Sequence, residues 1–485
     1  MFFDKFCSII DTRLQKAVEK PVPRTVGMGH VKEDIMNEQE KMNSLHPERT
    51  FTRTKLLMMA IGTFVGSGLV SLTGPAAAAT GYSVWLAYII AVIVGFLSML
   101  PLVYISSVMN FNGGVYTVAT TFMGHRFGGA FVLLQVLNAL ILSILGTAFG
   151  GYVNSVFPCL DARVCGALII ILFWAVHCVG INFMAGVQKY TTFILIAALA
   201  IFSIVSYTHL NSGTFDFSGP EFFTGGSKGV FAAVAMLVFS CQNYDNNVLA
   251  FGRYTITPKK NMPWGILATF GSLVLIYGLV TVAQVGAVDL AALSGKPLTD
   301  VSRAVLPTGA FIAFIILGPI LCLTSTVNGA LASFTIGLAK ASEDGWLPKS
   351  LSEQGKRGTY WKIITILSGI CLIPVLMGVN IGILSSITTL INCVFQIPLL
   401  LSYWKLPAAF PEEFAASSLH VKKEVYYVSI VIAFAARLFL TYCCFRTLTP
   451  QVAVGAVIVV FACFLFSYLR YKSGKPQVAD SYFFD

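Results

Sequence analysis

Long apolar runs recur along nearly the whole chain, and short polar stretches separate them. Each run has about twenty residues or more, which is the length that a helix needs to cross the hydrocarbon core of a bilayer. The pattern predicts an all-α membrane protein with twelve spanning helices. The approximate ranges are 56–76, 82–108, 127–156, 162–183, 187–208, 228–253, 262–289, 308–341, 361–378, 380–404, 424–446 and 450–471.

Composition supports a membrane class. Of the 485 residues, 56% are hydrophobic and 11% are charged, whereas about 25% of a soluble domain is charged. The N-terminal residues MFFDKFCSIIDTRLQKAVEK are too polar for a cleavable signal peptide. We expect 1–50 and 472–485 to be cytosolic tails. A short amphipathic helix over 2–18 and a flexible solvated tail are both compatible with the sequence.

The net charge of +10 does not indicate nucleic-acid binding, because the basic residues lie in short loops where they set membrane orientation. One set of alternate loops carries Arg126, Lys189, Arg253, Lys259, Lys260, Lys349, Lys356, Arg357, Lys422 and Lys423. The other set carries Arg163, Lys228, Lys296 and Arg303 among acidic residues. We expect the first set and both termini to face the cytoplasm of a cell, in its plasma or inner membrane.

Two predicted spans are interrupted. Residues 60–76 read AIGTFVGSGLVSLTGPA, and residues 239–247 read FSCQNYDNN. Interrupted spans at corresponding positions of two halves indicate an inverted-repeat transporter with its binding site at the interruptions. We therefore predict one repeat over 51–210 and a second over 228–405, followed by two further helices over 424–471.

An interrupted span frees backbone groups, which are tolerated at membrane depth where they line a cavity. Amides at Gly66, Ser67 and Gly68, at the start of a half-helix, would attract a carboxylate. Carbonyls near Phe64, at the end of the preceding half, would suit an ammonium group. An α-amino acid carries both groups, so the chemistry fits a zwitterion. The alternative is that these glycines only allow close helix packing.

Asp245 lies in the second interruption, where a carboxylate inside the membrane is by default a functional candidate. It could bind a cationic substrate group, carry a coupled proton, pair with a buried base, or cap the restarting half-helix. Phe239 is a candidate aromatic gate, with ordinary packing as the alternative.

Three motifs resemble the amino acid–polyamine–organocation (APC) superfamily. They are IGTFVGSGLVSLTGPAAAATGYSVWLAY in the first two spans, ITPKKNMPWGI after the sixth, and ALASFTIGLAKASEDGWLPKSL at the eighth. The resemblance covers about residues 50–470 and is specific to the family rather than to a substrate. It implies a LeuT-like five-plus-five inverted repeat with two extra C-terminal helices.

The resemblance also implies the site. It places the substrate carboxylate at Gly66, Ser67 and Gly68, and the ammonium at Phe64 and the backbone around Ser240 and Asn243. The chain departs from the family where the second interruption reads QNYDNN without glycine. It departs again at Arg253-Tyr254, where the family has an acidic residue, and at Gly337 or a neighbouring position, where the usual arginine of the eighth span is missing.

Coupling is open between sodium, protons and exchange without an ion. Proton-coupled relatives place a lysine midway along the fifth span, where this chain has ILIA at 194–197. Sodium-coupled relatives place hydroxyls in the eighth span, where Ser325 and Thr326 follow Thr324. The alternative is that these hydroxyls bond back to their own helix. His177 is expected to be a packed histidine rather than a proton relay. No Cys/His spacing fits a metal site, and no other cofactor is expected.

Partners are predicted from one loop. Cys159 and Cys165 resemble the exterior loop through which light chains of heteromeric amino acid transporters are linked to a single-span glycoprotein. Bridging to each other and remaining reduced are the favoured alternatives. A homo-oligomer is also open, and the lipid bilayer is the expected environment.

The leading functional hypothesis is a secondary transporter that moves an amino acid by alternating access. A polyamine or organic-cation transporter, and a channel or nutrient receptor on the same scaffold, are the alternatives. No predicted span carries an HExxH or GxSxG motif, and the chain has no Walker motif, so neither an enzyme nor an ATP-driven pump is expected.

Overall fold

The computed structural model describes residues 49–66, 68–241, 248–293, 298–379, 381–446, 450–478 and 482–484. The chain divides into two units, Met1–Arg49 and Thr50–Asp485, and every element below belongs to the second. The predicted N-terminal tail, Ser67, Asn243 and Asp245 lie outside the described residues.

The first helices follow one another closely from Arg53 to Val108. They are α3 (Arg53–Phe64), the π-helical turn η1 (Gly68–Leu72), α4 (Thr73–Thr80), η2 (Gly81–Ser83), α5 (Val84–Leu97) and α6 (Leu100–Val108). The Thr52 side chain caps α3 by accepting a hydrogen bond from the Lys55 backbone N–H. The predicted first span thus corresponds to α3, η1 and α4 rather than to one continuous α-helix.

The next group of helices comprises α7 (Val115–Met123), α8 (His125–Asn138), α9 (Ile141–Val156), α10 (Ala162–Val179) and α11 (Ile181–Tyr207). Of these, α7 ends at Gly124 and α10 ends at Gly180. Asp161 caps α10 by accepting from the backbone N–H groups of Arg163 and Val164. Gly180 separates α10 from α11 with a φ of 146°, a value that favours glycine. The boundary therefore falls several residues before the predicted one.

The second half of the chain carries the remaining long helices. They are α12 (Gly226–Leu237), α14 (Pro258–Gly286), α17 (Thr308–Ile315), α18 (Leu321–Glu343), α19 (Trp361–Met377), α20 (Ile381–Ser402), α23 (Lys423–Arg446) and α24 (Pro450–Lys472). The shorter elements are η3 (Ser212–Phe215), η4 (Val238–Ser240), η5 (Leu249–Tyr254), α15 (Leu290–Leu293), α16 (Leu298–Val305), η6 (Ile316–Ile320), η7 (Lys349–Leu351), η8 (Tyr403–Lys405), α21 (Leu406–Ala409) and α22 (Pro411–Ala415).

The described strands form one small antiparallel pair. Strand β1 (Asn110–Phe111) pairs with β2 (Tyr482–Phe483), with Asn110 opposite Phe483. This pairing joins the C-terminal end of the chain to the segment that follows α6.

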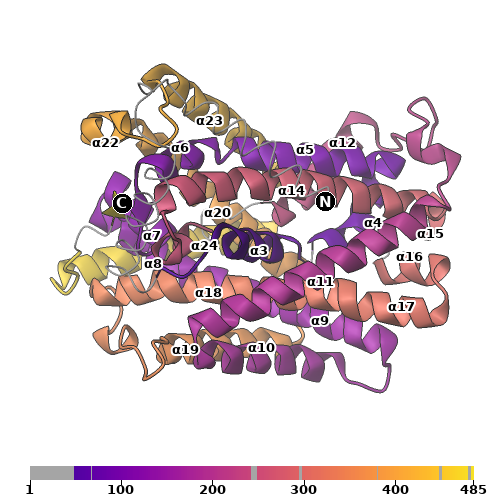
Figure 1. Cartoon of the computed structure of the whole chain (residues 1–485), viewed down its shortest axis with the longest axis horizontal. Helices are drawn as coiled ribbons and strands as arrows, with labels where there is room; N and C mark the ends of the chain where they lie inside the picture. Colours follow the sequence, from indigo (N-terminus) through magenta and orange to yellow (C-terminus); the bar gives the residue numbers. More distant parts are fainter. Residues whose placement is uncertain are drawn as a thin grey trace, which may run out of the picture. The chain divides into compact units, whose positions relative to one another are not determined.

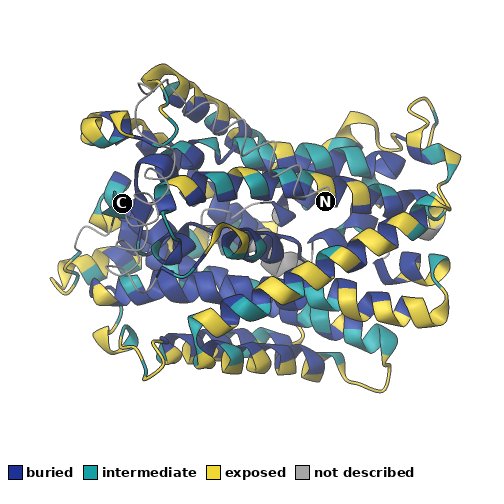
Figure 2. Ribbon diagram, viewed as in Figure 1, coloured by how far each residue is buried: buried dark blue, intermediate teal, exposed yellow. Residues whose placement is uncertain are grey.

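Eight described helical stretches are long and apolar enough to cross a membrane. They are Arg53–Val108, His125–Val156, Ala162–Val179, Ile181–Tyr207, Pro258–Gly286, Thr308–Glu343, Lys423–Phe445 and Val452–Lys472. Large apolar side chains such as Phe193 on α11 and Val457 on α24 are exposed, and Figure 2 shows exposed positions along the outer helices. An exposed apolar surface of this kind needs lipid around it. The predicted multi-pass helical membrane architecture is confirmed in this coarse form.

Helix α18 lies at the centre of the packing. Every residue from Cys322 to Ala339 is buried, and α18 contacts α3, α9 and α11 (Figure 1). Helix α14 packs on α5 and also contacts α3 and α11. Because α3 lies against both α14 and α18, these two helices supply the side chains that meet its interrupted end.

Candidate substrate-binding site

The first interruption begins where α3 ends. Phe64 is the last residue of α3, and the N–H of the following residue, Val65, donates to the Ile61 carbonyl at 2.8 Å. The chain resumes as the π-helical turn η1 at Gly68. Phe64, Gly66 and Gly68 are all buried, so the backbone groups near the interruption must find partners inside the protein.

The described part of the sixth predicted span ends beside this interruption. Helix α12 continues into η4, whose last residue is Ser240, and Ser240 is buried. A Cβ atom added to Gly68 would lie 1.6 Å from Ser240 Oγ. Gly68 and Ser240, both predicted from sequence as site residues, are therefore in direct contact, and glycine is required for that approach.

A tyrosine joins the two helix ends. The Tyr277 hydroxyl, on α14, donates to the Phe64 carbonyl at 2.7 Å and lies 3.3 Å from the Ser240 carbonyl. The Tyr88 hydroxyl, on α5, donates to Ser240 Oγ at 2.9 Å, and the Tyr88 and Tyr277 ring centroids are 4.7 Å apart. Sequence reasoning missed both tyrosines. The available signal was a phenol in the middle of an apolar span, since a buried Tyr O–H needs a partner.

Helix α18 supplies donors to the other carbonyls at the end of α3. Thr326 Oγ1 lies 3.2 Å from both the Gly62 and Val65 carbonyls and 3.0 Å from the Cys322 carbonyl on its own helix. Cys322 Sγ contacts the Val65 carbonyl at 3.0 Å and the Gly66 carbonyl at 3.3 Å. The Thr326 hydroxyl and the Cys322 thiol, with one hydrogen each, are therefore shared among several carbonyls at the end of α3.

The other candidate hydroxyls also have protein partners. Ser325 Oγ accepts from Gln188 Nε2 at 2.7 Å, and Thr324 Oγ1 donates to the Leu321 carbonyl at 2.9 Å. Back-bonding, the alternative weighed from the sequence, therefore applies to Thr324 and, through the Cys322 carbonyl, also to Thr326. The sodium site at Ser325 and Thr326 stays a prediction.

The remaining predicted site residues are not brought into this geometry. The backbone of Phe239 lies in η4, while its side chain, together with Ser67, Asn243 and Asp245, falls outside the description. Cys159 is an exposed free thiol and Cys165 a buried one. The structure therefore has no bridge between them, and linkage to a partner stays a prediction.

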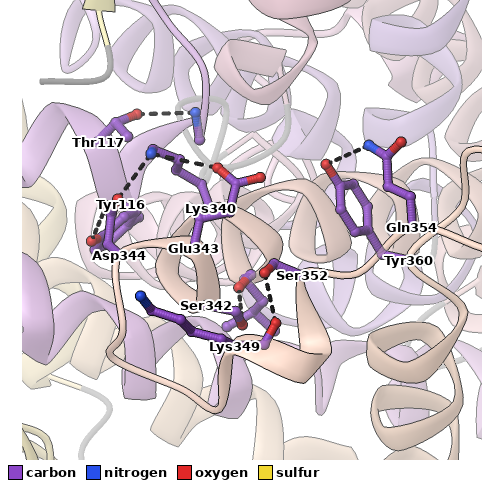
Figure 3. Close-up of polar contacts among 12 residues, drawn as sticks. Tyr116, Thr117, Lys340, Ser342, Glu343, Asp344, Lys349, Ser352, Gln354 and Tyr360 are labelled. Atoms are coloured by element: carbon purple, nitrogen blue, oxygen red, sulfur yellow. Dashed lines mark hydrogen bonds and ion pairs between the residues drawn. The ribbon is translucent and has the colours of Figure 1, made fainter. Parts of the chain in front are cut away.

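A charged cluster lies at the C-terminal end of α18, and Figure 3 shows its contacts. Lys340 Nζ lies 2.8 Å from Asp344 Oδ1 and 3.5 Å from Glu343 Oε2. The Tyr116 hydroxyl, on α7, donates to Asp344 Oδ2 at 2.7 Å. Burial, and then the negative charge of Asp344, raise the pKa of Tyr116 well above its ordinary value.

Gly337 lies one turn before that cluster. A Cβ atom there would lie 2.3 Å from Gln135 Nε2 of α8, so a side chain at this position would displace the glutamine. The missing arginine of the eighth span is thus accompanied by close packing of α8 against α18.

The apolar helices and the interrupted first span define an integral, multi-pass membrane protein. The family model described as amino acid permease matches residues 51–478, and the chain belongs to this family. The predicted membership of the amino acid–polyamine–organocation superfamily is thereby confirmed.

Individual relatives have low sequence identity to this chain, but the matches cover more than half of it. The branched-chain amino acid permease BcaP of Lactococcus lactis subsp. cremoris (strain MG1363) is 23% identical over 351 residues, which cover 64% of this chain and 72% of the relative. The methylthioribose transporter of Bacillus subtilis (strain 168) is 25% identical over 339 residues, covering 65% and 71%. The B. subtilis BcaP is 24% identical over 323 residues, covering 61% and 68%. All three are named as permeases or transporters, in agreement with the prediction that this chain is not an enzyme.

Proposed function

We propose that this protein is a secondary transporter that moves an amino acid across the membrane by alternating access. The observation that carries the proposal is the convergence of the Phe64 and Ser240 carbonyls on the single hydroxyl of Tyr277. Carbonyls at helix C-terminal ends carry partial negative charge, so the two together form a cradle for an ammonium group. In the bound state the ammonium would share or replace the Tyr277 hydrogen bond.

The carboxylate of the same substrate would bind at the other side of the interruption. The proposed ligands are the amides of Gly66, Ser67 and Gly68, at the start of η1, where the absence of side chains allows close approach. Bringing both charged groups between the helix ends requires Gly68 and Ser240 to move apart, because their present contact leaves no space for even a methyl group. That separation is the local motion that alternating access would use.

The described neighbours favour a substrate whose side chain is uncharged. The side chains that contact the two helix ends are the phenols of Tyr88 and Tyr277, the thiol of Cys322 and the hydroxyl of Thr326. The two relatives named as branched-chain amino acid permeases agree with an apolar side chain. Asp245 keeps the polyamine and organic-cation alternative open, since a carboxylate there would bind a second ammonium.

The finer architecture belongs to the same proposal. It comprises twelve spanning helices in a five-plus-five inverted repeat with two additional C-terminal helices, and both termini in the cytoplasm of the cell. The interruption between α3 and η1 supports it, as do the basic loops that the sequence places on one side.

Counterflow in proteoliposomes tests the proposed function. Purified protein is reconstituted with unlabelled leucine inside, and entry of labelled leucine, lysine and putrescine is compared. We expect leucine to show trans-acceleration. Binding without flux would instead indicate a receptor, flux without trans-acceleration a channel, and movement of putrescine alone the organic-cation alternative.

Two glycine variants link that activity to the site. Gly68→Ala should abolish leucine counterflow, because its Cβ would overlap Ser240 Oγ. Gly271→Ala, on α14, is the matched control. Beyond the backbone of its own helix, a Cβ atom there would meet no neighbour among the described residues within 4 Å. Equal activity of the two variants would contradict the assignment of Gly68. Comparison of leucine and lysine flux in Asp245→Asn tests whether that carboxylate selects charge.

A further inference from the structure

A chain of buried hydrogen bonds runs from α10 into the centre of the protein. His177 Nε2 lies 2.9 Å from Asn328 Oδ1 of α18. Asn328 Nδ2 donates to Gln188 Oε1 of α11 at 2.6 Å, and Gln188 Nε2 donates to Ser325 Oγ at 2.7 Å. All four side chains are at least nine-tenths buried, so each of these bonds replaces one that water would otherwise make.

The far end of this chain reaches the helix that ends in the proposed site. Ser325 Oγ lies 3.2 Å from Thr192 Oγ1, which donates to the Met58 carbonyl of α3 at 3.2 Å. A Cβ atom on Gly62 would lie 2.2 Å from both Gln188 Nε2 and Thr192 Oγ1. These hydrogen-bonded side chains therefore pack directly on α3, within two turns of Phe64.

Along this run of hydrogen bonds, each side chain donates to the next one in the direction from His177 to Ser325. Asn328 Nδ2 donates to the Met184 carbonyl, at 3.2 Å, as well as to Gln188. Its Oδ1 must then be the atom that faces His177, and the ring must donate from Nε2. Nδ1 is consequently the ring atom that remains to take up a proton.

His177 borders a cavity that is large enough for water. His177 lines a cavity of about 40 Å³ together with Thr335 and Tyr360, which exceeds the space of about 10–15 Å³ that one water needs. The wall also includes the loop residues Gly358 and Thr359, on the side that the charge pattern predicts to be cytoplasmic. His177 occupies the last turn of α10, where the helix carbonyls favour a cation.

Among the described residues, no carboxylate, lysine or arginine side chain lines this cavity with His177. The other titratable residues that line the cavity are the phenols of Tyr254, from η5, and Tyr360, at the start of α19. Gln354 Nε2 donates to the Tyr360 hydroxyl at 2.9 Å (Figure 3). The helices packed on α10 carry charged residues outside this cavity lining: Lys189 on α11, Lys340 and Glu343 on α18, and Lys362 on α19. Helix α9 carries none.

We propose that His177 is the proton-binding residue of this transporter and that its charge state controls the movement of α3. A proton from hydronium in the cavity adds to Nδ1 and leaves a water molecule behind. The resulting imidazolium donates a stronger, charge-assisted hydrogen bond to Asn328. That bond tightens the chain through Gln188 and Ser325, holds α3 in its present position, and so slows transport at acid pH. This inference rests on the proposed transport function.

Leucine exchange in proteoliposomes at equal internal and external pH, from 4 to 8, tests the proposal. Because burial disfavours the charged imidazole, we expect the wild-type rate to fall at the acid end of this range, by about tenfold toward pH 4. His177→Gln keeps an amide donor for Asn328 but cannot gain a proton, so its rate should stay constant. His209→Gln, at an exposed histidine, is the matched control and should behave as the wild type. A wild-type profile in His177→Gln would overturn the proposal.

A second variant changes the partner instead of the ring. Asn328→Asp places a carboxylate against His177, which favours the imidazolium by an amount typical of close opposite charges, about one pH unit or more. The fall in exchange rate should therefore move to higher pH by at least that amount. An unshifted pH profile would overturn the proposed link between the charge of His177 and the hydrogen bonds that lead to α3.

Thermal unfolding of the purified protein separates this inference from the proposed function. The melting temperature of wild type minus that of His177→Gln should change between pH 4 and 8, whether or not leucine is a substrate. The corresponding difference for His209→Gln should change less. A constant difference for His177→Gln would overturn proton binding, whereas absent leucine flux with a pH-dependent difference would count against the transport assignment alone.

Discussion

The middle of α18 and its C-terminal end both carry polar clusters, but only the end cluster is charged. The middle cluster consists of Ser325, Asn328, Gln188, Thr192 and His177. Its bonds join amides, hydroxyls and one imidazole, and they connect α18 to α3, α10 and α11. A buried polar network of this kind is tolerated when its members are paired with one another.

The end cluster consists of Lys340, Glu343, Asp344 and Tyr116. Asp344 is 2% exposed, and its side chain contacts both the Lys340 ammonium and the Tyr116 hydroxyl. The comparison shows that the position of a buried polar side chain along α18 determines whether it is charged or uncharged. Uncharged hydrogen-bonded side chains occur where apolar spans surround α18, and paired charges occur near its end.

The largest effect is expected from breaking the charged pair. Lys340→Met leaves the buried Asp344 carboxylate with the Tyr116 hydroxyl but no cation. Breaking a buried ion pair costs about 3–5 kcal/mol, and we expect a loss of free energy of unfolding in that range in detergent micelles. The double variant Lys340→Met with Asp344→Asn should recover most of it.

Lys362→Met is the matched control for that experiment. Lys362 Nζ lies 2.6 Å from Glu353 Oε2, but the Glu353 side chain is 66% exposed. An exposed pair contributes about 1 kcal/mol or less. Equal losses for Lys340→Met and Lys362→Met would show that burial does not distinguish the two ion pairs.

A smaller loss is expected from interrupting the middle cluster. Asn328→Leu removes the acceptor for His177 Nε2 and the donor for Gln188 Oε1, leaving buried polar atoms unpaired. We expect a loss of about 2 kcal/mol in the free energy of unfolding. Thr335→Val, on the same helix, removes only a bond to the Leu331 carbonyl of its own helix and should cost less. The reverse order would mean that the amide chain adds little stability.

The smallest effect concerns pH. Tyr116 in the unfolded chain ionises near its ordinary pKa of about 10, whereas its raised pKa keeps it protonated in the folded protein. Its contribution to stability is therefore complete below pH 10 and declines as the pH rises above that value. Tyr116→Phe should be less stable by about 1 kcal/mol at pH 8. The gap in melting temperature between wild type and Tyr116→Phe should narrow from pH 10 to 11, and a constant gap would contradict the shifted pKa.

Much of the helical organisation was predictable because it is local. The predicted spans 262–289 and 424–446 differ by only a few residues from α14 and α23, since apolar run length is set by bilayer thickness. The glycines at 66 and 68 likewise marked the end of α3. The start of α11 was misplaced, because the apolar pattern continues across Gly180 and only its left-handed backbone ends α10.

The candidate site was predictable only in part. Phe64, Gly68 and Ser240 were chosen from sequence and lie together, because their backbone positions follow from the interruptions. Tyr277 was not chosen, since its contact with Phe64 joins residues 213 positions apart. From the sequence, Gly337 could be interpreted only as the absence of the family's arginine. Its packing against Gln135 depends on how closely α8 approaches α18.

The sequence by itself determined that this chain lies in a membrane as a set of apolar helices, that its first span is interrupted by glycine, and that it resembles the permease family. Those properties depend on neighbouring residues and on the bilayer as solvent. Only the tertiary structure decided which donor meets which buried carbonyl, and that His177 is linked to α3 through Asn328 and Gln188. A hydrogen bond requires atoms to meet within about 3 Å, and the packing of distant helices sets that distance.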